Sequence, residues 1–306
     1  LVAREGMPAP GTASYFGNQL REPVLNDKGQ VAFQAHLLGS ETDASIWIGG
    51  GHLLIPIART GDDPPPLTED NDQFLSFDDP LLNNLGHTAF RALIHGDGIS
   101  PVAGVNDRGI WSKTAAGLSL IPRAGEIAPG TPVIAGSNTL FTDFSSPVLN
   151  DVGEIAFRAV LVGNDVTANN MHGIWAERAG VGLRLVAREG AIAPGTNQPF
   201  AVLGLPAFNV RGRTAFGARL LGGGSGIWKE ELGGLELVAR SGDAVSNRTD
   251  SLVFAGFDQP LLTNLNRVAF AATLAGPGVV TGENDRGIFI ERRAGLAMIA
   301  RTGDAA

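Results

Sequence analysis

The sequence repeats one motif along almost its whole length, and this repeat limits the possible fold more than any other feature. The pattern N-x-x-G-x-x-A-F occurs at Asn26–Phe33, Asn83–Phe90, Asn150–Phe157 and Asn209–Phe216. A fifth copy, Thr263–Phe270, has Asn266 at the glycine position. Because asparagine tolerates a left-handed backbone better than other non-glycine residues, we predict a turn with positive φ in all five copies. Such self-similarity predicts a fold built from repeated supersecondary units.

Each copy of the motif runs into a segment whose apolar residues alternate with period two. In the first copy Val31, Phe33, Ala35 and Leu37 occupy one face, and the other copies keep the order β-branched, aromatic, small, aliphatic. The opposite face begins with Ala32, and this position is alanine in every copy. The alternation is typical of a β-strand that is packed on both faces. We therefore predict one inner strand in each unit, with a small residue where a neighbouring sheet approaches.

Two further motifs follow in every unit. The first is G-I-W, which holds all four tryptophans of the chain and occurs, with two variants, at Ser45–Trp47, Gly109–Trp111, Gly173–Trp175, Gly226–Trp228 and Gly287–Phe289. The second is a run that ends in arginine before a glycine and usually an acid, at Leu54–Arg59, Leu118–Arg123, Leu183–Arg188, Leu235–Arg240 and Leu296–Arg301. We predict that the aromatic residue forms a wedge between adjacent sheets. Each arginine is expected to bind a nearby carboxylate or carbonyl and to fix the turn that follows.

These motifs place four short strands in each of five units. Repeated four-stranded sheets are typical of a β-propeller, in which each sheet packs face to face with the next. The sequence therefore predicts an all-β, five-bladed β-propeller of four-stranded blades, forming a single domain over residues 1–306. The predicted units cover approximately residues 12–59, 60–123, 124–188, 189–240 and 241–301, and residues 1–11 hold an extra strand and a connector.

The arginine-ending run occurs six times, because Leu1–Arg4 is a surplus copy. One blade does not hold two outer strands of the same kind, so the fold has a surplus outer-strand copy at one chain end. Three explanations are open: the chain is cut from a longer array, the copy is a tail, or the strand pairs with another molecule by strand exchange. The third explanation predicts self-association through the terminal strand.

Composition excludes several classes of function. The formal charge of −8 at pH 7 argues against nucleic-acid and anionic-membrane partners, since phosphate binding needs clustered cations. The chain has no cysteine, which excludes disulfides, thiolate catalysis and cysteine-ligated metals. No apolar run approaches the length of a membrane span. What remains is a protein that binds, assembles or acts on partners of other kinds.

The N-x-x-G-x-x-A-F units, with their G-I-W and L-V-A-R-x-G companions, resemble the bacterial tandem-repeat proteins named for the first of these motifs. The resemblance covers residues 1–304, with the fifth copy degenerate. It implies a repeat fold and an exported, often surface-anchored protein. We therefore expect a secreted or cell-surface location. The resemblance implies no catalytic residues.

The expected binding sites lie in the loops on one rim of the propeller. Loops between second and third strands are long at 95–108, 163–172 and 276–286, and long loops on a rigid scaffold commonly carry binding sites. The candidate ligand-binding residues are Asp97, Asn106, Asp107, Asn164, Asp165, Asn284 and Asp285. Clustered carboxylates suit calcium, and the candidate metal ligands are Asp62, Asp63, Asp70 and Asp72. No calcium-loop spacing is present, and no motif requires another cofactor.

The sequence favours a non-catalytic extracellular binding or assembly module, with a glycan or protein as partner and a structural calcium as a further hypothesis. The alternative is a carbohydrate-active enzyme, a glycoside hydrolase or lyase, that uses carboxylates in the propeller funnel or on its rim. Its candidate carboxylates are Asp78, Asp79, Asp143 and Asp258. The repeat differs between copies mainly in loops and shows no conspicuous catalytic constellation. For this reason the non-catalytic interpretation comes first.

Overall fold

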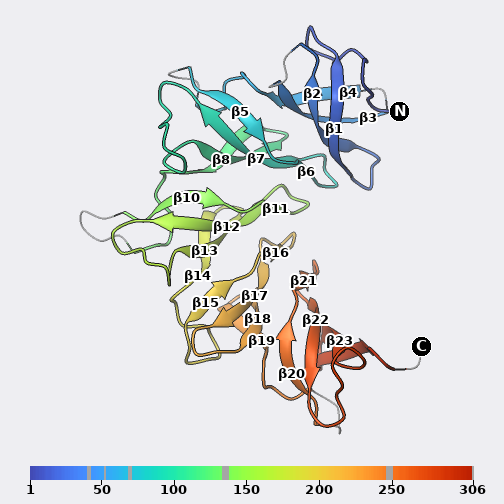
Figure 1. The fold of residues 1–306 in the computed structure, drawn as a ribbon, viewed down its shortest axis with the longest axis vertical. Coiled ribbons are helices and arrows are strands. Elements are labelled where there is room, and N and C mark those ends of the chain that lie inside the picture. Colours follow the sequence, from blue (N-terminus) through green and yellow to red (C-terminus); the bar gives the residue numbers. More distant parts are fainter. Residues whose placement is uncertain (40–42, 52, 68–70, 133–137, 246–250, 305–306) are drawn as a thin grey trace. The chain divides into compact units, whose positions relative to one another are not determined.

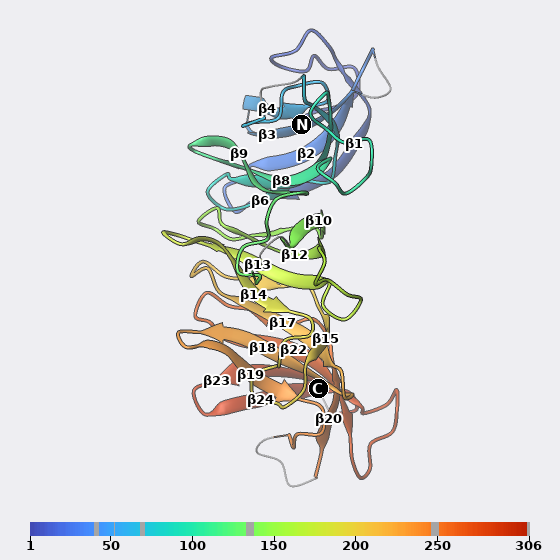
Figure 2. The same ribbon diagram turned by 90° about the vertical axis from the view of Figure 1, so that its left-hand side faces the viewer.

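The protein is all-β and consists of five four-stranded antiparallel sheets of the propeller-blade type (Figure 1). The structure, a computed structural model, describes residues 1–39, 43–51, 53–67, 71–132, 138–245 and 251–304. These residues contain strands and no helix. The fold class predicted from the repeat is thus confirmed. We number the sheets blades 1 to 5 in chain order, and Figure 2 shows them from the side.

Every blade has four main strands that follow one another in the sheet in chain order. The first strands are β1 (Phe16–Leu25), β5 (Gln73–Phe77), β10 (Leu140–Phe144), β15 (Phe200–Leu203) and β20 (Val253–Phe257). The second strands are β2 (Val31–Leu37), β7 (Thr88–His95), β12 (Ile155–Val162), β17 (Thr214–Leu220) and β22 (Val268–Ala275). The third strands are β3 (Ala44–Gly50), β8 (Arg108–Thr114), β13 (His172–Arg178), β18 (Ser225–Glu231) and β23 (Arg286–Arg292). The fourth strands are β4 (Leu53–Arg59), β9 (Gly117–Arg123), β14 (Gly182–Arg188), β19 (Gly234–Arg240) and β24 (Gly295–Arg301).

A two-residue strand also pairs with the second strand in blades 2 to 5. These short strands are β6 (Leu81–Leu82), β11 (Val148–Leu149), β16 (Ala207–Phe208) and β21 (Leu261–Leu262). Blade 1 has no separate short strand, because β1 continues through this region with two register shifts. Each predicted repeat unit contains one of the five sheets.

The N-x-x-G turn has the backbone conformation that its residues predict. The four motif glycines have positive φ, and Asn266 takes their place in blade 5 with a φ of +63°. The motif asparagine stabilises the turn with its side chain: Asn26 Oδ1 accepts the amides of Lys28 and Gln30 at 3.1 and 2.9 Å. It also links blades, since Asn26 Nδ2 donates to the carbonyl of Asn83 at 2.9 Å.

By contact density the chain divides into two compact units. The first comprises Leu1–Ile155 with Ala159–Asn164, and the second comprises Ala156–Arg158 with Asp165–Ala306. Blades 1 and 2 thus lie within the first unit, and blades 4 and 5 lie within the second. The prediction of a single domain stays a prediction.

In the first unit, the core lies between the facing surfaces of blades 1 and 2. Ile46 and Ala58 of blade 1 share one buried cluster with Phe74, Phe90 and Trp111 of blade 2. The rings of Phe74 and Trp111 meet edge to face with centroids 5.0 Å apart, an arrangement that the ring quadrupoles favour. An isoleucine–alanine surface therefore packs against an aromatic surface of the next blade.

The second unit repeats this packing. Ile174 and Ala187 pack with Phe200, Phe216 and Trp228. All four tryptophans are fully buried, with an exposed fraction of 0%. The prediction of an aromatic wedge between sheets is confirmed.

The surplus copy Leu1–Arg4 was expected to be a strand, but in the structure it joins none of the sheets formed by the described residues. A strand needs a hydrogen-bonded neighbour, and the outer position of blade 1 is already taken by β4. Instead Ala3, together with Met7 and Ala9, packs over the aromatic surface of blade 1. The segment therefore covers a core and is not a fifth strand.

Candidate functional site

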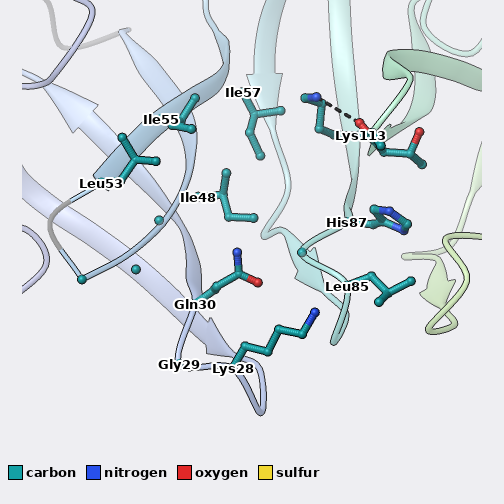
Figure 3. A pocket seen from close by; sticks show the side chains of 16 residues that line it. Lys28, Gly29, Gln30, Ile48, Leu53, Ile55, Ile57, Leu85, His87 and Lys113 are labelled. Atoms are coloured by element: carbon teal, nitrogen blue, oxygen red, sulfur yellow. Dashed lines mark hydrogen bonds between the residues drawn. The ribbon is translucent and has the colours of Figure 1, made fainter.

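A pocket of about 560 Å³ opens in the first unit between blades 1 and 2 (Figure 3). Its volume falls within the range of small-molecule sites. Its lining is Lys28, Gly29, Gln30, Ile48, Gly49, Gly50, Gly51, Leu53, Ile55, Ile57, Leu85, Gly86, His87, Lys113, Thr114 and Ala115. The pocket combines an apolar wall from blade 1 with cationic side chains from both blades.

Strands β3 and β4 build the apolar wall. Ile48 and Ile55 are ladder partners, and Leu53 and Ile57 extend the same surface (Figure 3). Leu53 is 65% exposed and Ile55 46% exposed. In every other blade the position of Leu53 is a glycine. Large apolar side chains exposed at positions where the repeat has none indicate a local function.

Two lysines supply positive charge to this pocket. Lys113 reaches in from β8, and its ammonium donates to the carbonyl of Thr114 at 3.0 Å. Lys28 enters from the N-x-x-G turn of blade 1, beside Gln30 (Figure 3). These are two of the three lysines of a chain whose formal charge is −8. Within the described part of the chain, neither lysine has an ion-pair partner. The ammonium groups are thus available to an anionic ligand.

The position that Lys113 occupies in blade 2 is glutamate in blades 3, 4 and 5, at Glu177, Glu230 and Glu291. Between blades 3 and 4, Glu230 pairs with Arg184, whose Nη2 lies 2.9 Å from Oε2. The equivalents of this pair between blades 1 and 2 are Lys113 and Ile55. An ion pair that fills the groove between blades 3 and 4 is therefore replaced by an open pocket.

Blades 4 and 5 fill their groove in a similar way. Lys229, at the position of Ile48, lies 2.7 Å from Glu291 and 2.8 Å from Glu231. Although burial opposes the charge, the bonds to these two carboxylates raise the pKa of Lys229. Blade 1 has isoleucine, Ile55 and Ile48, at the two positions that supply the cation in these two grooves, and blade 2 has lysine where blades 3 to 5 have the carboxylate. Both departures from the repeat meet at the pocket.

Because blade 2 has Lys113 in place of the glutamate, a buried threonine hydroxyl in this blade has no hydrogen-bond acceptor among the described residues. Oε2 of Glu230 accepts both the amide and the hydroxyl of Thr214 at 2.9 Å. The equivalent of Thr214 in blade 2 is Thr88, which is fully buried, and its Oγ1 has no hydrogen-bond partner among the described residues. A lysine cannot accept that bond, so Lys113 costs stability here. A local violation of this kind is typical of functional positions.

His87 also lines the pocket, and its ring points away from the apolar wall (Figure 3). The ring lies against the turn of blade 3, where a Cβ on Gly153 would come within 2.6 Å of Nδ1. Burial, and then the charge of Lys113, lower the pKa of His87. The imidazole is therefore neutral at pH 7, and the positive charge of the pocket comes from the lysines.

Overlapping segments 1–135, 39–246 and 222–306 match one family, described as "Family of unknown function (DUF7453)". The chain belongs to this family. The overlapping matches of the DUF7453 family along the chain fit a repeat protein. No curated protein matches the chain.

Two solved structures are similar at low identity. A puromycin-hydrolyzing peptidase of Mycobacterium tuberculosis is 13% identical with a TM-score of 0.36. That match covers 92% of this chain, and the chain spans only 46% of the peptidase. A luciferin-regenerating enzyme is 11% identical with a TM-score of 0.29, with 94% of each chain covered. At these scores neither similarity bears on the activity of this DUF7453 protein.

The predicted rim residues of blade 2 are held within their own loop. Asn106 Oδ1 accepts the amide of Ser100 at 2.7 Å, and Asp107 accepts the amide of Gly104 at 2.8 Å and pairs with Arg108 at 3.0 Å. Asp97 is exposed and accepts Asn71 Nδ2 at 3.2 Å. The role of these residues as ligand-binding groups stays a prediction.

The other two long loops contain similar contacts. Asn284 Oδ1 accepts the amide of Val280 at 2.7 Å, and Asp285 accepts the amide of Leu274 through its carbonyl at 2.6 Å. The carbonyl of Asp165 accepts Asn170 Nδ2 at 3.0 Å, and Asn164 is exposed. Their predicted binding role is likewise untested.

In four blades the arginines of the fourth strands bind a carbonyl or a carboxylate, as predicted, but these partners lie in the loops between second and third strands and not in the turn that follows each arginine. Arg123, Arg188 and Arg301 each donate Nε to a loop carbonyl, namely those of Asn106, Asn170 and Asn284, at 2.9, 2.9 and 2.7 Å. In blade 1 the partner is a carboxylate, because Arg59 pairs with Asp43. The ring of arginines is thus structural in these four blades.

The acidic segment predicted to bind calcium is only partly described. Asp72 is buried and accepts the amide of Gly98 at 3.3 Å, and burial raises the pKa of Asp62. Asp63 is described, whereas Asp70 lies outside the described residues. Within those residues no group of three or more His, Asp or Glu side chains is placed to hold a metal ion. A calcium site there stays a prediction.

The carboxylates considered for catalysis contact arginines. Arg91 Nε binds Asp78 at 2.7 Å, and its Nη1 lies 3.5 Å from Asp143. In blade 5 Asp258 pairs with Arg286. Burial, and then the charges of Glu22 and Asp78, raise the pKa of Asp79. These contacts give Asp78, Asp143 and Asp258 structural partners.

No helix among the described residues is long and apolar enough to cross a membrane.

The loop of blade 2 should weaken in acid through Asp107. Burial opposes its ionisation, but Arg108 and the amide of Gly104 lower the pKa of Asp107 below its ordinary 3.8. The stabilisation is present above 3.8 and is lost as the pH falls through the lower folded-state value. We expect the difference in free energy of unfolding between the wild type and Asp107→Asn to shrink across this range. Urea unfolding at several pH values measures it, and a difference independent of pH would contradict the assignment.

Proposed function

We propose that this protein is a non-catalytic binding module whose site is the pocket between blades 1 and 2. Its ligand is a small anion with an apolar body. The observation that carries the proposal is Lys113, which stands where blades 3 to 5 have glutamate and has no ion-pair partner among the described residues. Ile48 and Ile55 line the same pocket and give it an apolar wall opposite Lys113.

The expected binding mode follows from the pairs that fill the other grooves. A ligand carboxylate would take the position of the missing glutamate carboxylate and accept from Lys113, and charge-assisted bonds of this kind are the stronger ones. The apolar body would cover Ile48, Ile55 and Leu53, two of which are strongly exposed. Removing that surface from water favours binding by about 25 cal/mol per Å². Lys28 at the mouth adds a second, more exposed charge.

Octanoate is a suitable probe, with 1-octanol as the neutral control. We expect isothermal titration to show octanoate binding to the full chain and much weaker binding of 1-octanol. Lys113→Met should weaken octanoate binding about tenfold, equivalent to about 1.4 kcal/mol. The matched control is the double variant Ile55→Arg with Lys113→Glu, which rebuilds the Arg184–Glu230 pair in this groove. It should stay folded and lose binding altogether.

Two outcomes would count against this site. Equal affinity for octanoate and 1-octanol would show that Lys113 does not select an anion. Undiminished octanoate binding by the double variant would place the ligand elsewhere on the chain. Thermal melts of both variants show that any loss of binding is not a loss of fold.

An extracellular setting belongs to the same proposal and is supported by the resemblance to exported repeat proteins. The exposed polar side chains of the three long loops support a glycan or protein partner on the rim, and the acidic segment at Asp62, Asp63 and Asp72 supports calcium there. A glycan array probed with and without chelator tests these points. Product analysis of any hit decides the alternative of a carbohydrate-active enzyme, because turnover would overturn the non-catalytic assignment.

A further inference from the structure

A side chain in the middle of the second strand links each of the first three blades to the blade that follows it. In each case its terminal nitrogen donates to the carbonyl of the residue that ends the first strand of the next blade. The pairs are Gln34 with Phe77, Arg91 with Phe144 and Arg158 with Leu203. The N–O distance is 3.2 Å in the first pair and 2.8 Å in the third. Each pair lies within one of the two compact units.

Blade 4 has no side chain at this position, because Gly217 stands there. A second side chain is missing beside it. In blade 2 Arg91 also pairs with Asp78 at 2.7 Å, and the equivalent of Asp78 in blade 4 is Gly204. Among the described residues, no side chain donates to the carbonyl of Phe257, which ends the first strand of blade 5. The interface between blades 4 and 5 thus has the acceptor of this link without its donor.

The ladder of blade 5 does not use the carbonyl of Phe257 either. Phe257 lies opposite Ala272 of β22, and the amide of Asp258 donates to the carbonyl of Ala271 at 2.9 Å. This is the pattern of a non-hydrogen-bonded antiparallel pair, so the carbonyl of Phe257 points away from β22. It is therefore available to a donor from outside the sheet.

A pocket of about 220 Å³ opens where the two side chains are missing. It lies entirely in the second unit, and its lining includes Gly204, Gly217, Arg219 and Ser225 of blade 4 with Phe257 and Gln259 of blade 5. A Cβ on Gly217 would meet Ile227 Cδ1 at 3.6 Å, which is an ordinary contact. The groove therefore has room for the group that the repeat places there in blades 1 to 3.

Arg219 supplies a positive charge to the same pocket. It lies two residues from Gly217 on the same face of β17, roughly 7 Å further along the strand. Arg219 is exposed, and within the described part of the chain no carboxylate or carbonyl binds its guanidinium. The equivalent residues in the other blades are His36, Leu93, Val160 and Thr273. The pocket thus has a free acceptor at one end and an unpaired cation towards the other.

We propose that this pocket binds a small molecule that carries both a guanidinium and a carboxylate. The guanidinium takes the position that the Arg158 side chain has in the preceding interface, and it donates to the carbonyl of Phe257. The carboxylate pairs with Arg219 through charge-assisted hydrogen bonds. This site is separate from the Lys113 pocket, which lies in the first unit.

L-arginine is the probe, and agmatine, which has the guanidinium but no carboxylate, is the matched ligand. Isothermal titration of the full chain should show saturable binding of L-arginine and binding of agmatine that is weaker by about tenfold, the effect of one charge-assisted bond. Arg219→Gln should weaken L-arginine binding by a similar factor and should not weaken agmatine binding. Absence of L-arginine binding would overturn the proposal, and so would an equal loss for both ligands in Arg219→Gln.

Gly217→Arg supplies the missing side chain from the chain itself. It should abolish L-arginine binding and raise the melting temperature by about 2–4 °C, because its guanidinium donates to the carbonyl of Phe257. The rise should exceed that of Gly217→Ala, which removes a strand glycine but adds no donor.

Gly233→Arg is the control for adding an arginine to blade 4. Gly233 lies in the turn after β18, outside the pocket, with no atom within 4 Å of the position that a Cβ would take. This variant should bind L-arginine as the wild type does. L-arginine binding that survives Gly217→Arg, or a melting temperature that this substitution does not raise, would overturn the proposal.

Discussion

Replacing Trp228 with alanine should lower the free energy of unfolding of the second unit by about 3–5 kcal/mol, as for other large-to-small changes in cores. Trp228 is fully buried and meets Phe200 edge to face at 5.0 Å. Its indole nitrogen donates to the carbonyl of Pro194 at 2.9 Å. Alanine removes the wedge between blades 3 and 4 and leaves that carbonyl without its donor.

The matched control is Trp228→Phe, because blade 5 already has phenylalanine at this position. Phe289 is 1% exposed and meets Phe254 edge to face, so phenylalanine fits the wedge and should cost much less than alanine. Guanidinium unfolding followed by tryptophan fluorescence and circular dichroism gives both values. Equal losses for the two variants would show that the indole hydrogen bond, and not the packed volume, decides stability here.

Replacing Asn83 with alanine should cost about 2–4 kcal/mol, because it removes the four hydrogen bonds of a buried side chain, one of them to Nδ1 of His87. Oδ1 accepts the amides of Leu85 and His87 at 3.0 and 2.8 Å, which holds the N-x-x-G turn. Nδ2 donates to the carbonyl of Asn150 at 2.8 Å. The alanine variant loses the turn and the link to the next motif copy together.

Asn83→Asp separates these two effects. Aspartate still accepts the two turn amides but no longer donates to Asn150, so its cost should lie between those of the wild type and Asn83→Ala. Hydrogen exchange of the Leu85 and His87 amides reports on the turn alone. If Asn83→Asp destabilises as much as alanine, the link between blades outweighs the turn.

Much of the fold was predictable because it depends on local chemistry. The positive φ of Asn266 follows from backbone sterics at one residue. The strand of Val31 and Phe33 follows from period-two burial, and the burial of Trp111 from its recurrence in every unit. A carbonyl partner for Arg123 was also expected, but not that this carbonyl, of Asn106, lies in the loop between the second and third strands.

The candidate pocket was not predicted, although the sequence contains a signal for it. Lys113 stands at a position that is glutamate in blades 3 to 5. Ile55 stands where the other blades have Ser119, Arg184, Glu236 or Ala297. The long loops were expected to hold the binding site, since loops differ most between the copies of the repeat. A comparison of inner positions between copies would have shown the departure, but not that Lys113 and Ile55 face each other.

The sequence alone determined the number of units, the four strands of each, the turn conformations and the aromatic wedge. These depend on short-range sterics and on which face of a strand is apolar. The tertiary structure decided that Lys113 faces Ile48 and Ile55, and that Leu1–Arg4 covers a core instead of extending a sheet. Contacts between blades depend on register and on which faces meet, and neither is encoded in the local pattern of one repeat.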